Sequence, residues 1–347
     1  MGASVADEPA VARRDRGIPP VYAALDLGTN NCRLLIARPQ RGGFRVVEAF
    51  SRIVRLGEGL SRSGELSEAA MARTIEALKI CSEKMARRGV TVARAVATEA
   101  CRRAGNGAEF MHDVKRSTGI SLDIITSAEE ARLALTGCTP LLEAPHSHAI
   151  VFDIGGGSTE ILWAKLLGGS RTEVIDWISL PFGVVNLTER YGAGDNHSGS
   201  YAQMIDEVAA VLEPFEAKHR LSRHLGSGKV QVLGTSGTVT TLAGVLLDLP
   251  RYERRQVDGC WLDFPAVIAQ SRRLAAQTVP ERAQYPCIGE ERADLVVAGC
   301  AILEALHRFW PAERLRVADR GVREGVLVEL MRQHARQEQS GRTERRR

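Results

Sequence analysis

Two aspartates in this sequence each stand between an apolar run and a turn of small and polar residues. Asp26 lies in ALDLGTNNCRLLIA and Asp153 lies in AIVFDIGGGSTEILWA, and a second apolar run follows each turn. Glycine lets the backbone approach a ligand closely, and the N–H groups of such a turn can bind phosphate oxygens. Two turns with one plan therefore predict two related halves of the molecule that face a single phosphate-bearing ligand.

Carboxylates flank the second of these turns. Asp153 precedes the glycines and Glu160 follows them. Mg²⁺ prefers carboxylate, water and phosphate oxygens, so this pair predicts a Mg²⁺ site, with Mn²⁺ as the alternative metal. Each glycine costs conformational entropy and a plain hairpin turn needs fewer of them, so GGG favours phosphate binding over a structural turn.

Two further stretches have both a chemical and a structural interpretation. LGTSGT, residues 233–238, lies between a predicted strand and a predicted helix, where it can contact a ligand or cap the helix. SAEEARL begins a predicted helix at Ser127, and Ser127 with Glu130 fits a capping box, in which the acid occupies the third helical position. From the residues alone, capping is the stronger interpretation of Glu130.

Length and composition are those of an ordinary soluble protein. The 347 residues leave room for two domains, and the hydrophobic share of 44% and the charged share of 25% are typical of globular chains. No apolar run approaches the ~18 residues of a membrane-spanning helix. Residues 1–19 mix acids and bases without an apolar core, which predicts a disordered leader. The seven cysteines include no Cys-x-x-Cys pair, which predicts reduced thiols in a cytosol.

The net charge of +4 belongs to the C-terminal segment. Residues 331–347 contain six arginines and two glutamates, so the rest of the chain is neutral. We predict a disordered basic tail over residues 337–347. Such a tail is either a solvated end or an electrostatic attractor for a polyanion.

The same order of predicted elements occurs twice. Residues 21–137 are predicted to form three strands, then helix, strand, helix, strand and helix. From residue 149 three strands, a helix, a strand and a helix recur, followed by two helices, a strand and a last helix. This order predicts an α/β protein with one domain over residues 20–137 and another over 138–320.

Seven stretches give the chain a specific resemblance to a known family. It resembles the exopolyphosphatase and guanosine pentaphosphate phosphatase family of the actin-like ATPase superfamily, from residue 22 to about residue 330. The resemblance implies two actin-like (ribonuclease H-like) domains with mixed sheets flanked by helices, and an active site in the cleft between them. It also implies that the last helix, about residues 321–336, joins the first domain. The stretches are DLGTNNCRLLIA, ATEACRRA, SAEEARLALTG, DIGGGSTEI, LGTSGTVTTLA, ERADLVVAGCAIL and ADRGVREG.

The resemblance reverses the interpretation of SAEEARL. It implies that Glu130 is the catalytic base, which orients and deprotonates the water that attacks a terminal phosphorus. Glu129 is the alternative base, and Glu160 is implied as the second catalytic residue. The capping interpretation remains the structural competitor.

The resemblance further implies the binding residues. Arg102 of ATEACRRA is expected to bind phosphate through its planar guanidinium, and Asp26 to join Asp153 and Glu160 at the metal. The other expected substrate-binding residues come from the three turns: Thr29, Asn30, Asn31, Gly155, Gly156, Gly157, Ser158, Thr159, Gly234, Thr235, Ser236 and Gly237.

The implied function is Mg²⁺-dependent hydrolysis of the terminal phosphate of inorganic polyphosphate, with release of orthophosphate. Removal of the 5′ terminal phosphate of guanosine pentaphosphate is the alternative. An actin-like ATP-binding chaperone or a kinase is less well supported, because SAEEARL and RGVREG match the phosphatase family better. We expect a cytoplasmic protein with no membrane or nucleic-acid partner, and the resemblance implies a homodimer.

Overall fold

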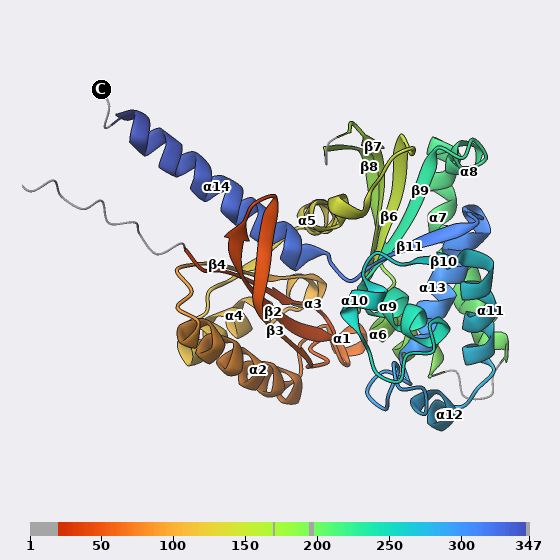
Figure 1. The fold of residues 1–347 in the computed structure, drawn as a ribbon. Helices are drawn as coiled ribbons and strands as arrows, with labels where there is room; N and C mark the ends of the chain where they lie inside the picture. Colours follow the sequence, from red (N-terminus) through yellow and green to blue (C-terminus); the bar gives the residue numbers. More distant parts are fainter. Residues whose placement is uncertain (1–19, 169–170, 194–197, 345–347) are drawn as a thin grey trace, which may run out of the picture.

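The structure, a computed structural model, describes residues 20–168, 171–193 and 198–344. These residues form two α/β lobes side by side, with helix α5 (Ser127–Cys138) between them and helix α14 (Val322–Glu344) projecting past the first lobe (Figure 1). The leader predicted over residues 1–19 lies outside the described residues. None of the described helices is both long enough and apolar enough to cross a membrane.

The first lobe is built on a five-stranded sheet with the order β3-β2-β1-β4-β5. β1 pairs antiparallel with β2 and parallel with β4, and a parallel neighbour requires a crossover, which the long helix α2 supplies. The strands are β1 (Tyr22–Leu27), β2 (Asn31–Gln40), β3 (Gly43–Ile53), β4 (Val92–Ala97) and β5 (Leu122–Ile124), and the helices before α5 are α1 (Leu60–Ser63), α2 (Glu68–Arg87), α3 (Glu99–Arg103) and α4 (Gly107–Thr118).

The second lobe is built on a six-stranded sheet with the order β10-β11-β9-β6-β7-β8. The strands are β6 (His148–Ile154), β7 (Thr159–Leu166), β8 (Thr172–Leu180), β9 (Val230–Thr235), β10 (Trp261–Asp263) and β11 (Arg314–Ala318). The helices are α6 (Val184–Tyr191), α7 (Ser198–His219), α8 (Leu221–Leu225), α9 (Ser236–Leu246), α10 (Arg254–Val257), α11 (Phe264–Ala275), α12 (Val279–Ala283) and α13 (Val296–Phe309), with a 3₁₀ turn η1 (Thr139–Leu141) after α5.

The two sheets repeat one topology. Strands β8-β7-β6-β9-β11 match β3-β2-β1-β4-β5 in order and in the direction of every pairing, and β10 is an addition that runs antiparallel to β11. Asp26 and Asp153 are each the penultimate residue of a central strand, β1 and β6. The prediction of two related α/β halves is confirmed, and the repeat places the two aspartates at equivalent points.

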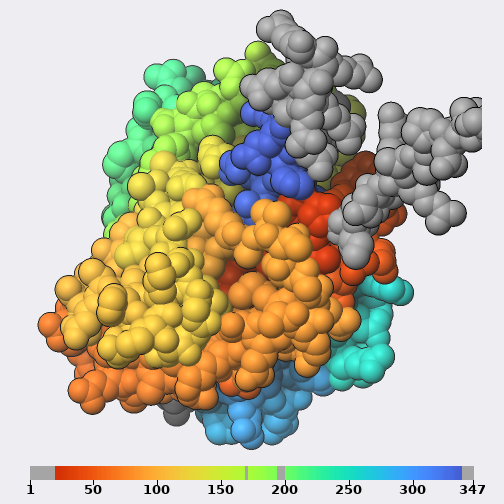
Figure 2. All heavy atoms as spheres, turned by 90° about the vertical axis from the view of Figure 1, so that its left-hand side faces the viewer, coloured from red at the N-terminus to blue at the C-terminus, as the bar shows by residue number. Residues whose placement is uncertain are grey.

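Two helices cross between the lobes. α5 follows the first sheet, yet its Ala131 and Leu135 pack in one cluster with the second sheet. α14 follows the second sheet, and its Val326 packs against the first. The two segments touch at Gly137 and Gly325, where a Cβ atom would overlap backbone atoms of the opposite segment. Figure 2 shows α14 in blue where it emerges between the red strands of the first sheet and the yellow segment that contains α5.

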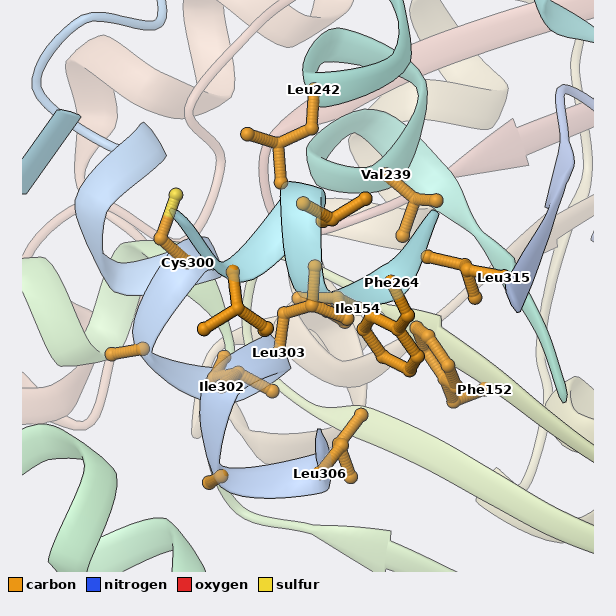
Figure 3. Close-up of a cluster of buried hydrophobic side chains, with 14 of the residues drawn as sticks. Phe152, Ile154, Val239, Leu242, Phe264, Cys300, Ile302, Leu303, Leu306 and Leu315 are labelled. Atoms are coloured by element: carbon orange, nitrogen blue, oxygen red, sulfur yellow. The ribbon is translucent and has the colours of Figure 1, made fainter. Parts of the chain in front are cut away.

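The larger hydrophobic core lies in the second lobe. Figure 3 shows Phe152 of β6, Phe264 of α11 and Leu315 of β11 beside one another, with Val239 and Leu242 of α9 towards the top of the view. Removing apolar surface from water stabilises the fold by roughly 25 cal/mol per Å². This core therefore holds β6, and with it Asp153, in a fixed position.

Polar contacts also connect the lobes. Arg55, which follows β3, makes a bidentate ion pair with Asp294 ahead of α13, with nitrogen–oxygen distances of 2.8 and 3.1 Å. The N–H of Gly59 donates to the Glu189 carboxylate of α6 at 2.6 Å. The backbone N–H of Arg55 also donates to the Asn30 carbonyl at 3.0 Å. Arg55 therefore contacts both the turn after β1 and the second lobe.

The start of α5 corrects the sequence prediction. An N-cap residue has extended dihedral angles, and Thr126 has φ −72° and ψ 158°, whereas Ser127 is already helical. The Thr126 hydroxyl accepts a hydrogen bond from the N–H of Glu129, which occupies the third helical position. The predicted capping box of Ser127 with Glu130 is therefore wrong, and the Glu130 side chain is free of a capping role.

The end of the chain also differs from the prediction. α14 continues to Glu344, into the segment for which the sequence predicts a disordered tail from residue 337. A helix whose first turns are packed gains a hydrogen bond for each residue added, which explains the extension. Residues 345–347 lie outside the described residues.

Candidate active site

The two aspartate-bearing turns meet at a cleft between the lobes. The cleft has a volume of about 500 Å³, and its wall is mainly polar and charged. Asp26 and the turn after β1 line it from the first lobe, and Asp153 with the turn after β6 lines it from the second. Glu130, in the first turn of α5, also lines the cleft.

The second turn needs glycine because the two turns lie in contact. A Cβ atom at Gly156 would lie 3.0 Å from the backbone nitrogen of Asn30, and one at Gly157 would lie 2.8 Å from the hydroxyl oxygen of Thr29. On the other side, Gly183 packs directly against the backbone of Gly156. The GGG stretch is therefore explained by contact between the lobes as well as by room for a ligand.

Most of the predicted substrate-binding residues of the two turns line the cleft. Thr29, Asn30 and Asn31 line it from the first lobe, and residues 155–158 line it from the second. The side-chain oxygens of Asn30 and Asn31 are buried and have no hydrogen-bond partner among the described residues. Because an unpaired buried polar atom is costly, a donor or cation of a bound ligand would stabilise both amides.

Thr159 and Gly234 have structural roles instead. Thr159 is fully buried, and its hydroxyl donates to the Phe182 carbonyl at 2.7 Å. A Cβ atom at Gly234 would lie 2.6 Å from the ring of Phe152, so this position is glycine because of core packing. Neither residue lines the cleft or the cavity next to it, and their binding of substrate stays a prediction.

The third turn, LGTSGT, contributes less than predicted. The Thr235 hydroxyl donates to the Arg320 carbonyl at 2.6 Å, so Thr235 also has a structural role. Ser236 lines the cleft, and Gly237 lines a cavity next to it. The turn therefore contacts the ligand space only through its last residues.

Four of the acids at the cleft have raised pKa values. Asp26, Asp153 and Glu130 line it, whereas Glu160 is buried, with its Oε1 accepting a hydrogen bond from the Ser179 hydroxyl at 2.9 Å. Burial raises the pKa of all four carboxyls, that of Asp153 to about 6 and that of Glu160 to about 7, and repulsion between neighbouring carboxylates adds to the rise. Acids with pKa values raised in this way are typical of functional sites.

The raised pKa values predict how the metal-free protein responds to pH. In the unfolded chain Asp153 and Glu160 have ordinary pKa values of 3.8 and 4.5, so the folded state binds more protons between about pH 4 and about pH 7. Stability therefore falls as the pH rises from about 4 to about 7, because the unfolded chain gives up these protons more readily than the folded protein does. We expect the melting temperature in excess chelator to be higher at about pH 5 than at about pH 8. Glu160→Gln is expected to flatten this slope, and an unchanged slope in that variant would contradict the assignment.

Arg102 contacts Glu130 from outside the wall of the cleft. Its Nη1 and Nη2 each lie 3.4 Å from Glu130 Oε2. Nη1 also donates to the Ile125 carbonyl at 2.6 Å, and Nη2 donates to Glu99 at 2.6 Å. In this arrangement Arg102 contacts the Glu130 carboxylate, and its direct binding of phosphate stays a prediction.

Arg33 lines the cleft and is absent from the residues that the sequence predicts for the site. In the β1–β2 pairing Arg33 lies opposite Asp26, the position that Glu160 takes opposite Asp153 in the β6–β7 pairing. Burial raises the pKa of both aspartates, and the Arg33 guanidinium opposes that rise. Arg33 follows Asp26 at the same sequence spacing at which Glu160 follows Asp153, and this shared spacing could have identified Arg33 from the sequence.

A second cavity of about 500 Å³ adjoins the cleft and shares Asn30, Asn31 and Arg33 with it. Its other charged wall residue is Arg292, which donates to the Thr241 hydroxyl at 3.2 Å. The space between the lobes thus joins a strongly charged compartment to one with partly apolar walls. The apolar wall residues are Ile154, Val184, Leu295 and Val296.

Comparison with known proteins places this site in a family. Residues 35–334 match the family model of the Ppx/GppA phosphatase family. The chain is 30% identical over 321 residues to a guanosine-5′-triphosphate,3′-diphosphate pyrophosphatase of Aeromonas salmonicida, and the match covers 90% of this chain and 60% of that protein. The chain therefore spans about 60% of the length of the curated relatives that it matches.

Solved structures of similar proteins share the fold. The Ppx/GppA family member of Aquifex aeolicus is 29% identical, with a TM-score of 0.71 over 90% of this chain and 98% of that one. An exopolyphosphatase from Cytophaga hutchinsonii is 25% identical, with a TM-score of 0.79 over 89% of this chain and 96% of that one. Because the family model spans most of both lobes and the solved relatives share their arrangement, this chain belongs to the Ppx/GppA phosphatase family.

Proposed function

We propose that this protein is an exopolyphosphatase, which hydrolyses the terminal phosphoanhydride bond of inorganic polyphosphate and releases orthophosphate. The observation that carries the proposal is one cleft lined by Glu130, Asp26, Asp153 and the glycine turn of residues 155–158. Backbone N–H groups of such a turn bind phosphate oxygens, and a carboxylate with a raised pKa accepts a proton near neutral pH. The shared fold of the Cytophaga hutchinsonii exopolyphosphatase supports the substrate class.

Glu130 acts as the general base in the proposed reaction. It takes a proton from water while the water oxygen bonds to the terminal phosphorus, the bond from that phosphorus to the bridging oxygen breaks, and the shortened chain leaves. Burial raises the pKa of Glu130 well above its usual value, and the Arg102 guanidinium limits that rise. A carboxylate with a raised pKa is a stronger base than an exposed one, which suits the proposed role.

One cationic group and two hydroxyl groups of the cleft wall stabilise the charge on the phosphate being transferred. Arg33 is the guanidinium in the wall of the cleft, and the hydroxyls of Thr29 and Ser158 line the same wall. Groups that are already oriented lose little freedom during the reaction, so they stabilise the transition state more than mobile water does.

We also propose that Asp26 and Asp153 hold Mg²⁺, with Glu160 supporting them. Within the described residues, no three His, Cys, Asp or Glu side chains are already grouped as ligands of one ion. Mg²⁺ at phosphate sites is usually bound by one or two carboxylates together with phosphate oxygens and water. The two aspartates and the unpartnered oxygens of Asn30 and Asn31 form a suitable set of oxygen donors. Mg²⁺ bound there would neutralise charge on the transferred phosphate.

Loss of the metal is expected to abolish turnover reversibly. Asp153→Asn removes a proposed ligand charge, so we expect the Mg²⁺ concentration for half-maximal activity to rise about tenfold or more. Asp176→Asn is the matched control, because Asp176 on β8 pairs with Lys218 and His219 away from the cleft. Orthophosphate release measured against Mg²⁺ concentration tests both variants. Full activity in excess chelator would contradict the proposed metal.

Guanosine pentaphosphate is the second candidate substrate, and the second cavity favours it. Its apolar residues and Arg292 offer a place for a base and sugar directly beside the charged compartment. The Aeromonas salmonicida relative, named for a guanosine nucleotide, supports the same candidate. Hydrolysis would use the same chemistry at the 5′ terminal phosphate.

A substrate panel tests the proposed function. Orthophosphate release is measured with short polyphosphate, long polyphosphate, guanosine pentaphosphate and ATP at equal concentrations of phosphate ends. We expect the highest kcat/KM with polyphosphate. A higher kcat/KM with guanosine pentaphosphate would make the second candidate the principal activity, and turnover of ATP alone would contradict both candidates.

A further inference from the structure

Glu99 is an acid in the wall of a cleft that is proposed to bind a polyanion. Like charges repel, so a carboxylate at this point weakens substrate binding unless it has another task. We propose that Glu99 is a positioning residue, which holds the Arg102 guanidinium against Glu130 and so orients the base. This inference rests on the proposed function and adds a residue that acts only through another side chain.

Three acceptors surround the Arg102 guanidinium. Glu99 Oε2 accepts from Nη2 at 2.6 Å, the Ile125 carbonyl accepts from Nη1 at 2.6 Å, and Glu130 Oε2 lies 3.4 Å from both nitrogens. Charge-assisted hydrogen bonds of this length are the strong ones, so Glu99 and Ile125 fix the plane of the guanidinium. Glu130 makes the longer contacts and therefore takes its orientation from Arg102.

The local sequence places Glu99 for this role. Glu99 and Arg102 are three residues apart on α3, so their side chains lie on the same face of that helix. Arg103, the next residue, lies 3.8 Å from the other Glu99 oxygen and is more exposed. The shorter bond therefore directs the Glu99 carboxylate to Arg102.

Packing from the other lobe restricts the Glu99 side chain. A Cβ atom at Gly157 would lie 3.0 Å from Glu99 Cγ, so the stem of Glu99 packs against the glycine turn. The side chains of Glu99 and Arg102 are 14% and 22% exposed. The bond between them is therefore pre-organised, which is what a residue that positions a base requires.

A double-mutant cycle tests whether Glu99 acts through Arg102. Glu99→Ala is expected to lower kcat about tenfold while KM changes less than about threefold, because an orientation needed in the transition state is lost. Glu99→Gln keeps an acceptor oxygen and is expected to restore part of kcat. In an Arg102→Ala background, Glu99→Ala is expected to change kcat less than about twofold, since its effect passes through Arg102.

A matched control variant and a readout that does not depend on activity complete the test. Asp113→Ala breaks another pair at the same spacing, Asp113–Arg116 on α4 at 2.8 Å, and is expected to leave the kinetics unchanged. Phenylglyoxal modification of Arg102, followed by peptide mass spectrometry, is expected to be faster in Glu99→Ala than in wild type or in Asp113→Ala. Melting temperatures confirm that the variants are folded.

Each outcome decides the inference. An equal loss of kcat in both backgrounds, an unchanged kcat in Glu99→Ala, or a raised Mg²⁺ requirement in that variant would overturn it. Unchanged labelling of Arg102 would overturn it as well. If wild type hydrolyses none of the substrates in the panel, the proposed function fails, and the labelling rates still decide whether Glu99 holds Arg102.

Discussion

Replacing Glu130 with glutamine is expected to lower kcat about 10²-fold or more and to leave the protein folded. Glutamine keeps the shape of the side chain but cannot accept the proton of the attacking water. Thr126 caps α5, so the change removes no capping bond. Burial raises the pKa of Glu130 because its carboxylate is removed from water. A neutral amide avoids that desolvation cost, so we expect a melting temperature equal to or above that of wild type.

Steady-state orthophosphate release with short polyphosphate measures this effect, together with the melting temperature. Glu129→Gln is the matched control, because Glu129 is the neighbouring acid and pairs with Arg94 of β4 at 2.8 Å. We expect the control to retain activity close to that of wild type. If Glu129→Gln abolishes turnover and Glu130→Gln does not, the general base is Glu129.

Replacing Gly325 with alanine is expected to destabilise the protein by about 3 kcal/mol. The new methyl group would overlap the carbonyl oxygen of Leu133 where α14 crosses α5. Both partners are backbone atoms of packed helices, so neither can move aside as a flexible side chain would. A shift of α5 would also displace Glu130, and small displacements of a catalytic group are costly, so we expect activity to fall as well.

Urea unfolding of the two proteins measures the difference in the free energy of unfolding. Gly226→Ala is the matched control, because Gly226 has φ −57° and a Cβ atom there would lie 3.6 Å from its nearest neighbour, the Arg223 carbonyl oxygen. We expect the control to change stability by less than about 0.5 kcal/mol. Equal stabilities of Gly325→Ala and Gly226→Ala would show that the helix crossing tolerates a side chain at Gly325.

Much of the site can be predicted from the sequence because it depends on local patterns. An apolar run that ends in Asp and a glycine turn occurs twice, and central strands with parallel neighbours place both aspartates at strand ends. The predicted convergence of the two turns is seen in the cleft that Asp26 and Asp153 share. Periodicity and turn residues are sufficient for this level of detail, since they reflect the backbone's own preferences.

The roles of small residues depend on contacts that a sequence does not contain. Gly234 is required by the ring of Phe152, and Thr159 donates to a backbone carbonyl, although both belong to glycine-bearing turns that otherwise reach the ligand space. A glycine that makes room for a side chain and one that makes room for a phosphate cannot be distinguished in a sequence. Only the packed structure separates the two cases.

The sequence by itself determined the repeated α/β plan and the two aspartate turns. The tertiary structure alone decided that Arg33 faces the cleft and that Arg102 contacts Glu130. The physical reason is the range of the interactions. Strand periodicity and turn chemistry act within a few residues, whereas strand register and the bonds of Arg102 to Ile125 and Glu130 depend on segments brought together by folding.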